Sequence, residues 1–349
     1  GVNILQGTVA IMEELEETQM NLQAFLTMRH VTPFRERAQD LLTSLSETSE
    51  TLERWLKVQM MWCSLESVFT GGDIAKQMPQ EAKKFQKVDK DFVKLMIKAE
   101  DTVLVVESCA NELLRTSLPL MYAELEKCQK SLEGYLEQKR NCFPRFYFVS
   151  NPGLLQILSQ GSDPTTMNQH YEKVFDSIFQ VIHDRKDKTI VHTMNSEGDP
   201  PAESIPFSTK VAAKGNIEEW LGALLGQMQT TLKDIARNCA ADIVTAGESI
   251  SLLRGFVDSY CAQFALLGIQ LLWTTDLQTA LEMCRAKKTI IKDTNHKMIE
   301  VLKELSGWCL QDLGAKSNRR KIETMVTVHV HQRDVITTIN GLYKAKKIH

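Results

Sequence analysis

The sequence contains few residues that interrupt helices: 9 prolines and 17 glycines among 349 residues. This scarcity leaves room for long, continuous helices. The sequence also lacks three catalytic motifs: a glycine-rich loop ending in Gly-Lys-Ser/Thr, a Gly-x-Ser-x-Gly turn and a His-Glu-x-x-His helix. Because these patterns position phosphate, a serine nucleophile and zinc respectively, their absence argues against those three kinds of catalysis. We expect no enzyme activity and no bound cofactor in this chain.

Other absences bear on the cellular compartment and on whether the chain crosses a membrane. The 8 cysteines are dispersed without a Cys-x-x-Cys pair, which is typical of reduced, buried thiols in the cytoplasm. An uncharged run of 17 residues lies between Asp258 and Asp276, and it contains Gln263 and Gln270. A membrane span needs about 20 residues, so we expect a buried core helix there and no membrane partner. No secretory signal is recognisable at the start of the sequence.

Charge is nearly balanced, with a formal net value of −3, so no nucleic-acid partner is expected. Residues 1–60 hold 5 Lys/Arg against 9 Asp/Glu, whereas residues 318–349 hold 7 against 2. The basic stretch is compatible with an acidic surface or nucleic acid as partner, but a solvated helix face is favoured. The acidic cluster Glu13, Glu14, Glu16 and Glu17 is likewise interpreted as a solvated helix face rather than an acid–base pair.

Helical periodicity dominates the sequence. Thr32-Pro33 is a good helix start, with Thr32 as the capping acceptor. Apolar residues then recur at steps of three and four: Ala38, Leu41, Leu42, Leu45, Leu52, Trp55, Leu56, Trp62, Leu65 and Phe69. A stripe of this length must be buried against neighbours. Further helices are predicted from Pro79 and over 118–142, 152–160, 164–182, 216–245, 248–258, 261–284 and 286–312. The 118–142 helix is expected to bury Leu120 and Ala123.

Two segments depart from this pattern. Residues 189–194 and 204–208 are β-rich and flank the turn-rich residues 196–201, which predicts a hairpin near 188–208. Pro206 limits the second run to an edge strand. Between Met325 and His331, apolar and polar residues alternate, which by itself favours a strand within an otherwise helical 317–342.

An aromatic, strand-like run follows the 118–142 helix. Pro144 ends that helix and Asn151-Pro152 starts another. Three interpretations are open: packing at a junction between bundles, a partner-binding surface, or a mechanical hinge. The candidate junction or hinge residues are Phe143, Pro144, Arg145, Phe146, Asn151 and Pro152. A second possible hinge is the 216–245 helix.

Other candidate chemistry is weak. His329 and His331 lie on different faces if helical, and no third ligand is near, so a metal site is not expected. His183 and His192 bracket a loop and are expected to satisfy local backbone groups. Cys128 and Cys142 are disfavoured as nucleophiles because a helix interior or junction is expected to bury both.

Four clusters of residues carry a resemblance to a known family. They are Trp55–Trp62 with Leu65-Glu66, Phe69 and Asp73-Ile74; Pro79–Phe85 with Val88-Asp89; Leu132–Arg140, Phe143–Ser150 and Leu154–Ser159; and Ser196–Gly198, Gly215–Trp220, Trp273-Thr274 and Val330–Val335. Their order and spacing resemble the linker of dynein heavy chains. Residues 69–74 and 126–131 are similar to axonemal rather than cytoplasmic dyneins.

The resemblance implies an all-α, elongated and bent rod of helical bundles with a small β-hairpin, and it favours helix for 317–342. It implies bundles over 1–142, a junction with hairpin over 143–214, and bundles over 215–349. The expected role is a lever that swings as ATP turns over in the ring of the same heavy chain. ATP and Mg belong to that ring, whose first module would begin beyond His349.

The partners that the resemblance implies are the ATPase ring, other dynein subunits and, indirectly, microtubules. The expected location is the cytoskeleton of the cytoplasm, in particular the axoneme of a cilium or flagellum. Glu13, Glu14, Glu16 and Glu17 are candidates for docking onto the ring. The alternative function is a helical scaffold or tethering protein that binds partners through an amphipathic surface.

Overall fold

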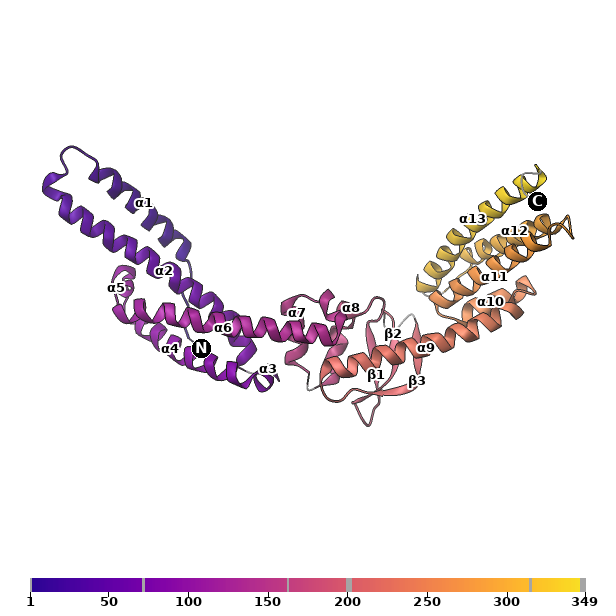
Figure 1. The fold of residues 1–349 in the computed structure, drawn as a ribbon, viewed down its shortest axis with the longest axis horizontal. Coiled ribbons are helices and arrows are strands. Elements are labelled where there is room, and N and C mark those ends of the chain that lie inside the picture. Colours follow the sequence, from indigo (N-terminus) through magenta and orange to yellow (C-terminus); the bar gives the residue numbers. More distant parts are fainter. Residues whose placement is uncertain (1, 71–72, 162, 199–202, 314–315, 346–349) are drawn as a thin grey trace. The chain divides into compact units, whose positions relative to one another are not determined.

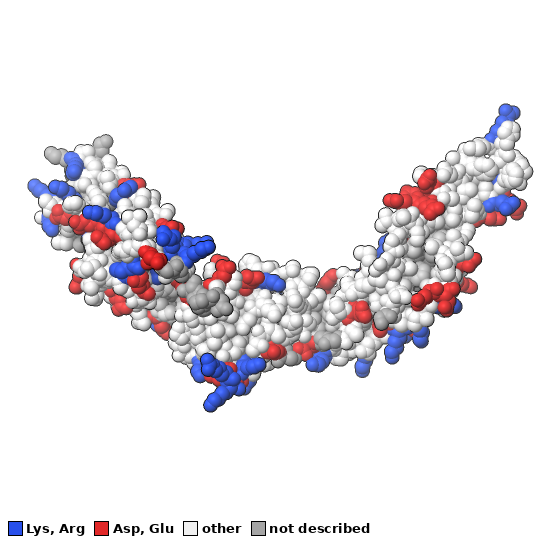
Figure 2. Space-filling model, turned by 180° about the vertical axis from the view of Figure 1, so that it is seen from behind, with Lys and Arg blue, Asp and Glu red and all other residues white. Residues whose placement is uncertain are grey.

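A computed structural model describes residues 2–70, 73–161, 163–198, 203–313 and 316–345 (Figure 1). Almost all regular structure in these ranges is helical, and a single three-stranded sheet accompanies it, which confirms the mostly helical fold class. The chain divides into two compact units, residues 1–167 and 168–349. On the face in Figure 2, Lys and Arg are interspersed with Asp and Glu rather than gathered into a surface of one sign.

The first unit is built on four long helices: α1 (Thr8–Leu26), α2 (Arg35–Phe69), α4 (Pro79–Glu100) and α6 (Glu112–Cys142). Three short helices complete it: α3 (Asp73–Gln77), α5 (Val105–Cys109) and α7 (Asn151–Ser159). Helix α2 packs against α1, α4 and α6. The rings of Trp62 and Phe92 lie 4.9 Å apart, and the Trp62 indole donates to Asp89 at 2.9 Å. The long apolar stripe of α2 is therefore buried by neighbours, as its length required.

Local details of this unit differ from the sequence-based expectations. Thr32 begins a short 3₁₀ helix, Thr32–Phe34, and caps nothing with its side chain. Leu41 is exposed. Helix α6 begins six residues early because Asn111 caps it, its Oδ1 accepting from the Leu113 amide at 3.0 Å. The buried face of α6 runs through Leu118, Met121, Leu125 and Cys128, whereas Leu120 and Ala123 are exposed.

The second unit contains one antiparallel sheet in the order β1-β2-β3. Its strands are β1 (Gln180–His183), β2 (Ile190–Asn195) and β3 (Ser204–Ala212). The predicted hairpin corresponds to β2 and β3, and Pro206 lies on an edge strand as expected. The turn residues 199–202 lie outside the described residues.

The helix predicted over 164–182 is wrong. A 3₁₀ helix covers Pro164–Gln169, and helix α8 covers only Tyr171–Val174. Residues 180–183 instead pair with β2, and the Val181 amide donates to the Asn168 side chain at 3.0 Å. Tertiary pairing thus overrides the local apolar spacing.

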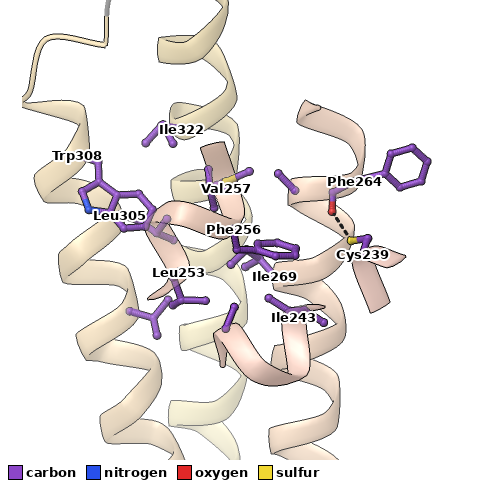
Figure 3. Close-up of a cluster of buried hydrophobic side chains, with 14 of the residues drawn as sticks. Cys239, Ile243, Leu253, Phe256, Val257, Phe264, Ile269, Leu305, Trp308 and Ile322 are labelled. Carbon is purple, nitrogen blue, oxygen red and sulfur yellow. Dashed lines mark hydrogen bonds between the residues drawn. The ribbon is translucent and has the colours of Figure 1, made fainter. Parts of the chain in front are cut away.

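Five helices complete the second unit: α9 (Ile217–Ala246), α10 (Ile250–Ser259), α11 (Ala262–Met283), α12 (Ile290–Cys309) and α13 (Lys316–Lys344). Figure 3 shows their shared core, in which Phe256 of α10 lies among side chains from α9 and α11, with Trp308 of α12 close by. The Cys239 thiol donates to the Phe264 carbonyl at 3.1 Å.

Helix α13 confirms the helical interpretation of 317–342. Its buried residues recur at steps of three and four rather than two: Ile322, Met325, His329, Gln332, Ile336 and Asn340. No helix among the described residues has the length and apolar character needed to cross a membrane.

Candidate functional site

The junction between α6 and α7 is a tight, ordered turn of the chain. The α6 helix ends at Cys142, and the Phe143 amide still donates to the Lys139 carbonyl at 3.0 Å. Phe143 itself is extended, with φ −133° and ψ 91°. The strand-like interpretation of 143–148 is wrong, because Pro144–Phe148 forms a 3₁₀ helix. Pro144 opens that helix, as a residue without an amide hydrogen does at little cost.

Arg140 holds the two sides of this junction together. Its Nη2 donates to the Val149 carbonyl at 3.1 Å and to Asn151 Oδ1 at 2.7 Å, and its Nε donates to the Phe146 carbonyl at 3.4 Å. One guanidinium on the last turns of α6 therefore binds both the 3₁₀ helix and the first residue of α7. Its planar, multi-donor shape suits this role, which a lysine could not fill with the same geometry.

The aromatic run is divided between core and surface. Phe143 and Phe146 are buried, with their rings 5.0 Å apart and close to perpendicular. Phe148 is 81% exposed. Tyr147 is also exposed, and its hydroxyl donates to Glu137 at 2.6 Å and contacts Asn141 at 3.0 Å. Core packing therefore accounts for the first two aromatic residues, and Phe148 presents its ring to solvent.

The other junction candidates lie at the start of α7. Ser150 caps this helix by accepting from the Gly153 amide, and Pro152 occupies its first turn. Of the sequence-based candidates, Phe146 and Asn151 contact Arg140 directly, and Phe143 packs its ring against that of Phe146. Arg140 was missed because its role depends on carbonyls up to nine residues away, which the helical pattern of α6 does not reveal.

The four candidate docking glutamates are all exposed on α1. Glu13 and Glu16 line a groove between α1 and α2 together with Met12, Met20 and Leu56. Glu14 and Glu17 do not line this groove. The structure thus separates the acidic cluster into two faces of one helix.

Helix α9 connects two different environments within the second unit. In its first half, Gln227 donates to Ser208 Oγ at 2.8 Å, and at its midpoint Thr231 Oγ1 accepts from the Ser208 amide at 3.2 Å, which ties α9 to β3. Near its end, Cys239 and Ile243 enter the core shared with α10 and α11. Between these two regions, residues 232–238 are half-buried or exposed, and Leu232, Ile235 and Ala236 pack against that same core. Helix α9 therefore changes neighbours near its middle (Figure 1).

The candidates for chemistry are explained by packing. His329 is buried, its Nε2 contacts the Met298 carbonyl at 3.2 Å, and burial lowers its pKa. His331 lies on the exposed side of α13. His183 Nδ1 contacts the Lys188 carbonyl at 2.6 Å, as expected, whereas His192 contacts the Thr193 hydroxyl. Within the described ranges, no three His, Cys, Asp or Glu side chains gather closely enough to hold a metal ion.

The two cysteines considered as nucleophiles differ. Cys128 is buried, and burial raises the pKa of its thiol. The expectation that Cys142 is buried is wrong: it is exposed on the last turn of α6.

These features define a helical structural region whose polar groups brace junctions and whose apolar groups fill bundle cores. Residues 1–239 match the sequence family described as "Dynein heavy chain, N-terminal region 2". The chain therefore belongs to the dynein heavy chains, and the match lies in their N-terminal region rather than in the ATPase ring.

Individual relatives agree with this assignment. The chain is 42% identical over 339 residues to dynein axonemal heavy chain 5 of Rattus norvegicus, covering 96% of this chain and 10% of the relative. It is 42% identical to dynein axonemal heavy chain 8 of Mus musculus, covering 96% of this chain and 7% of the relative. It is 41% identical to the flagellar outer-arm dynein gamma chain of Chlamydomonas reinhardtii, covering 94% of this chain and 7% of the relative. The chain thus spans a tenth or less of the length of these relatives.

Proposed function

We propose that this chain is the mechanical linker of an axonemal dynein, a lever that converts ATP-driven rearrangements of the heavy chain's ring into movement of cargo along microtubules. The observation that carries this proposal is the match to the N-terminal region of dynein heavy chains over 239 residues. The names of the relatives support a place in a ciliary or flagellar axoneme. ATP and Mg act in the ring, and the other partners are the ring itself, further dynein subunits and, through the motor, microtubules.

Packing supports a force-transmitting role. A lever must deform little along its length, and close-packed helices have low compressibility. Buried side chains fill the helical bundles of both units, so bending concentrates where packing changes. Two such places are proposed: the junction over residues 141–152 and the middle of α9.

The contacts at these two places differ. The junction is held by Arg140 and by the buried rings of Phe143 and Phe146. In the middle of α9, the ion pair between Arg237 and Asp234, at 2.9 Å, is local, because the two residues are three apart on the same helix. Leu232, Ile235 and Ala236 also pack against the core of the second unit there, but they are only half-buried. The middle of α9 is therefore the more compliant place, and the junction acts as a braced elbow.

The first test stiffens the junction in a motor that contains this chain. In a background in which the exposed Cys63 and Cys142 are replaced by serine, Arg140→Cys and Asn151→Cys place two thiols where the side chains now meet, and a short, cleavable cross-linker joins them. If the junction bends during the stroke, cross-linking slows microtubule gliding and leaves ATP hydrolysis by the ring largely intact. Cleaving the cross-linker in the same protein is the control. Gliding at the same speed before and after cleavage would exclude bending at 141–152.

The second test softens α9. Asp234→Gly with Arg237→Gly removes a local ion pair and adds about 1 kcal/mol of helix cost in total. The control, Glu300→Gly with Lys303→Gly, also replaces one acidic and one basic residue by glycine at the same spacing, on the exposed side of α12. We expect slower gliding from the α9 variant alone, at similar ATPase rates. Equal effects from both variants would show that α9 has no special role.

Docking of α1 onto the ring is a further part of the proposal. Exposed ion pairs contribute about 0–1 kcal/mol each, so contacts made by Glu13, Glu14, Glu16 and Glu17 would be weak and reversible, as a cycling lever requires. Reversing two of them, Glu13→Lys with Glu17→Lys, is expected to change the fraction of straight levers measured by energy transfer between two dyes. Reversal of Glu300 and Glu304 on α12 has the same spacing and serves as the control. An unchanged fraction would exclude the contact.

A further inference from the structure

Helices α4 and α6 lie side by side (Figure 1). Their side chains line a groove on the surface of the first unit. The groove has a volume of about 710 Å³. Its floor is apolar and recessed, because Val88, Leu95 and Met121 are each 5–8% exposed. Its α6 bank carries Leu113 and Leu120, which are 55% and 70% exposed. An apolar floor next to exposed leucines is costly in water unless something covers it.

The α4 bank of the same groove is basic. Lys84, Lys87, Lys94 and Lys98 line it, each exposed and each three, four or seven residues from the next, so that all four lie along one side of α4. Within the described part of the chain, none of these four lysines forms an ion pair. Two carboxylates, Asp91 and Glu124, also line the groove, and Glu124 already contacts Lys127 at 2.7 Å. Four lysines therefore face two carboxylates, and the groove keeps a net positive charge although Glu124 also attracts Lys84 and Lys87.

We propose that this groove binds an amphipathic helix of a partner protein, with acidic residues along one flank and an apolar stripe facing the floor. The length fits, since Lys84 and Lys98 are fourteen residues apart, or about 21 Å along a helix, and a partner helix of about four turns covers that distance. Apolar anchors at every third or fourth position would enter the floor, and Glu or Asp residues would meet the lysines. This inference goes beyond the lever function and does not depend on it.

The shape of the groove favours a helix over a lipid surface. A bilayer presents a flat boundary, and the apolar floor lies below banks of lysine and leucine side chains. Individual side chains of a helix reach such a floor, whereas a flat surface meets the banks first. Charge steers the partner and fixes its orientation, and burial of apolar surface supplies the salt-resistant part of the affinity.

The test uses the 349-residue chain and a fluorescent 16-residue peptide with leucines at helical spacing and glutamates on one flank, followed by anisotropy. Lys87→Glu with Lys94→Glu is expected to weaken binding about tenfold, from the loss and reversal of two charge contacts. The matched control, Lys83→Glu with Lys90→Glu, changes the same charges at the same spacing on the same helix, outside the groove. We expect less than a twofold change from the control. The four substituted lysines, Lys83, Lys87, Lys90 and Lys94, are all exposed, so we expect both variants to fold.

A second pair of reagents separates a groove from simple charge attraction. Leu113→Ser with Leu120→Ser leaves the lysines intact and is expected to weaken peptide binding about tenfold. A control peptide has the same composition but scrambled leucine positions, and we expect it to bind the unmodified chain at least tenfold more weakly than the original peptide does. Equal binding of both peptides, equal effects of the two lysine variants, or no binding would overturn the proposal. Capture of the chain by phosphatidylserine vesicles through Lys87 and Lys94, with displacement of the peptide, would overturn it in favour of a lipid surface.

Discussion

Replacing Arg140 is expected to open the junction between α6 and α7 without unfolding the rest of the chain. The guanidinium donates to Phe146, Val149 and Asn151 from one half-buried position. Hydrogen bonds to charged groups contribute about 1.5–3 kcal/mol, and the longest of these three is 3.4 Å, so Arg140→Gln should cost about 2 kcal/mol locally. Arg140→Lys keeps the charge but has one nitrogen, and we expect about half that loss.

Hydrogen exchange measures this opening directly. The Phe146 amide donates to the Phe143 carbonyl at 3.0 Å and the Val149 amide donates to the Phe146 carbonyl at 3.1 Å, so both amides are protected when the junction is closed. A local loss of about 2 kcal/mol corresponds to roughly 30-fold faster exchange. Mass spectrometry of the peptide spanning 143–150 reports this rate.

The control is an arginine whose contact is exposed. Arg237 pairs with Asp234 at 2.9 Å, and its side chain is 77% exposed, so Arg237→Gln should cost less than about 0.5 kcal/mol. Exchange around residue 237 is expected to change less than threefold. If Arg140→Gln left exchange at 143–150 unchanged, the brace would have no energetic role, and the buried aromatic pair alone would hold the junction.

Two further predictions concern the second unit. Gly268→Ala places a methyl 2.3 Å from Phe256 Cζ, so the free energy of unfolding in urea should fall by about 1–2 kcal/mol, even after the gain in helix propensity. Gly226→Ala has open space around it and should raise the free energy of unfolding by about 0.5–1 kcal/mol. Equal changes in the two variants would show that the Phe256 ring moves aside freely. Burial lowers the pKa of His329, so the unfolded chain binds its proton first as pH falls below about 6.5. Stability should therefore fall between pH 7 and the lower folded pKa, and His329→Gln should reduce this dependence; an unchanged slope would contradict the assignment.

Much of the fold was predictable because long helices bury residues at a regular spacing. The stripes of α2, α4 and α9 identify helices that neighbours cover, and Pro206 correctly indicated an edge strand. Helix α13 is the instructive exception. Val326, Val328 and Val330 alternate as in a strand, yet burial follows Met325, His329 and Gln332, because buried polar residues hide the helical period from a purely apolar pattern.

The junction was located from the sequence but not understood from it. Pro144 and Pro152 mark where helices end and begin, since their constraints are local. The aromatic run has strand-like composition, and only the contacts of Phe143 and Phe146 with each other decide for a 3₁₀ helix. Strand β1 was missed for the same reason: pairing of Val181 with Met194 is a long-range property that no local window contains.

Strand β3 has a consequence for how this protein behaves when crowded. An unpaired strand edge is a template onto which another chain can add, and long edges of this kind promote aggregation. β3 has nine residues and lies at one side of the sheet. Pro206 has no amide hydrogen to offer and interrupts the regular row of donors and acceptors that an incoming strand would need. The proline that weakens this strand as a partner within the sheet thus also makes it a poor seed for association between molecules.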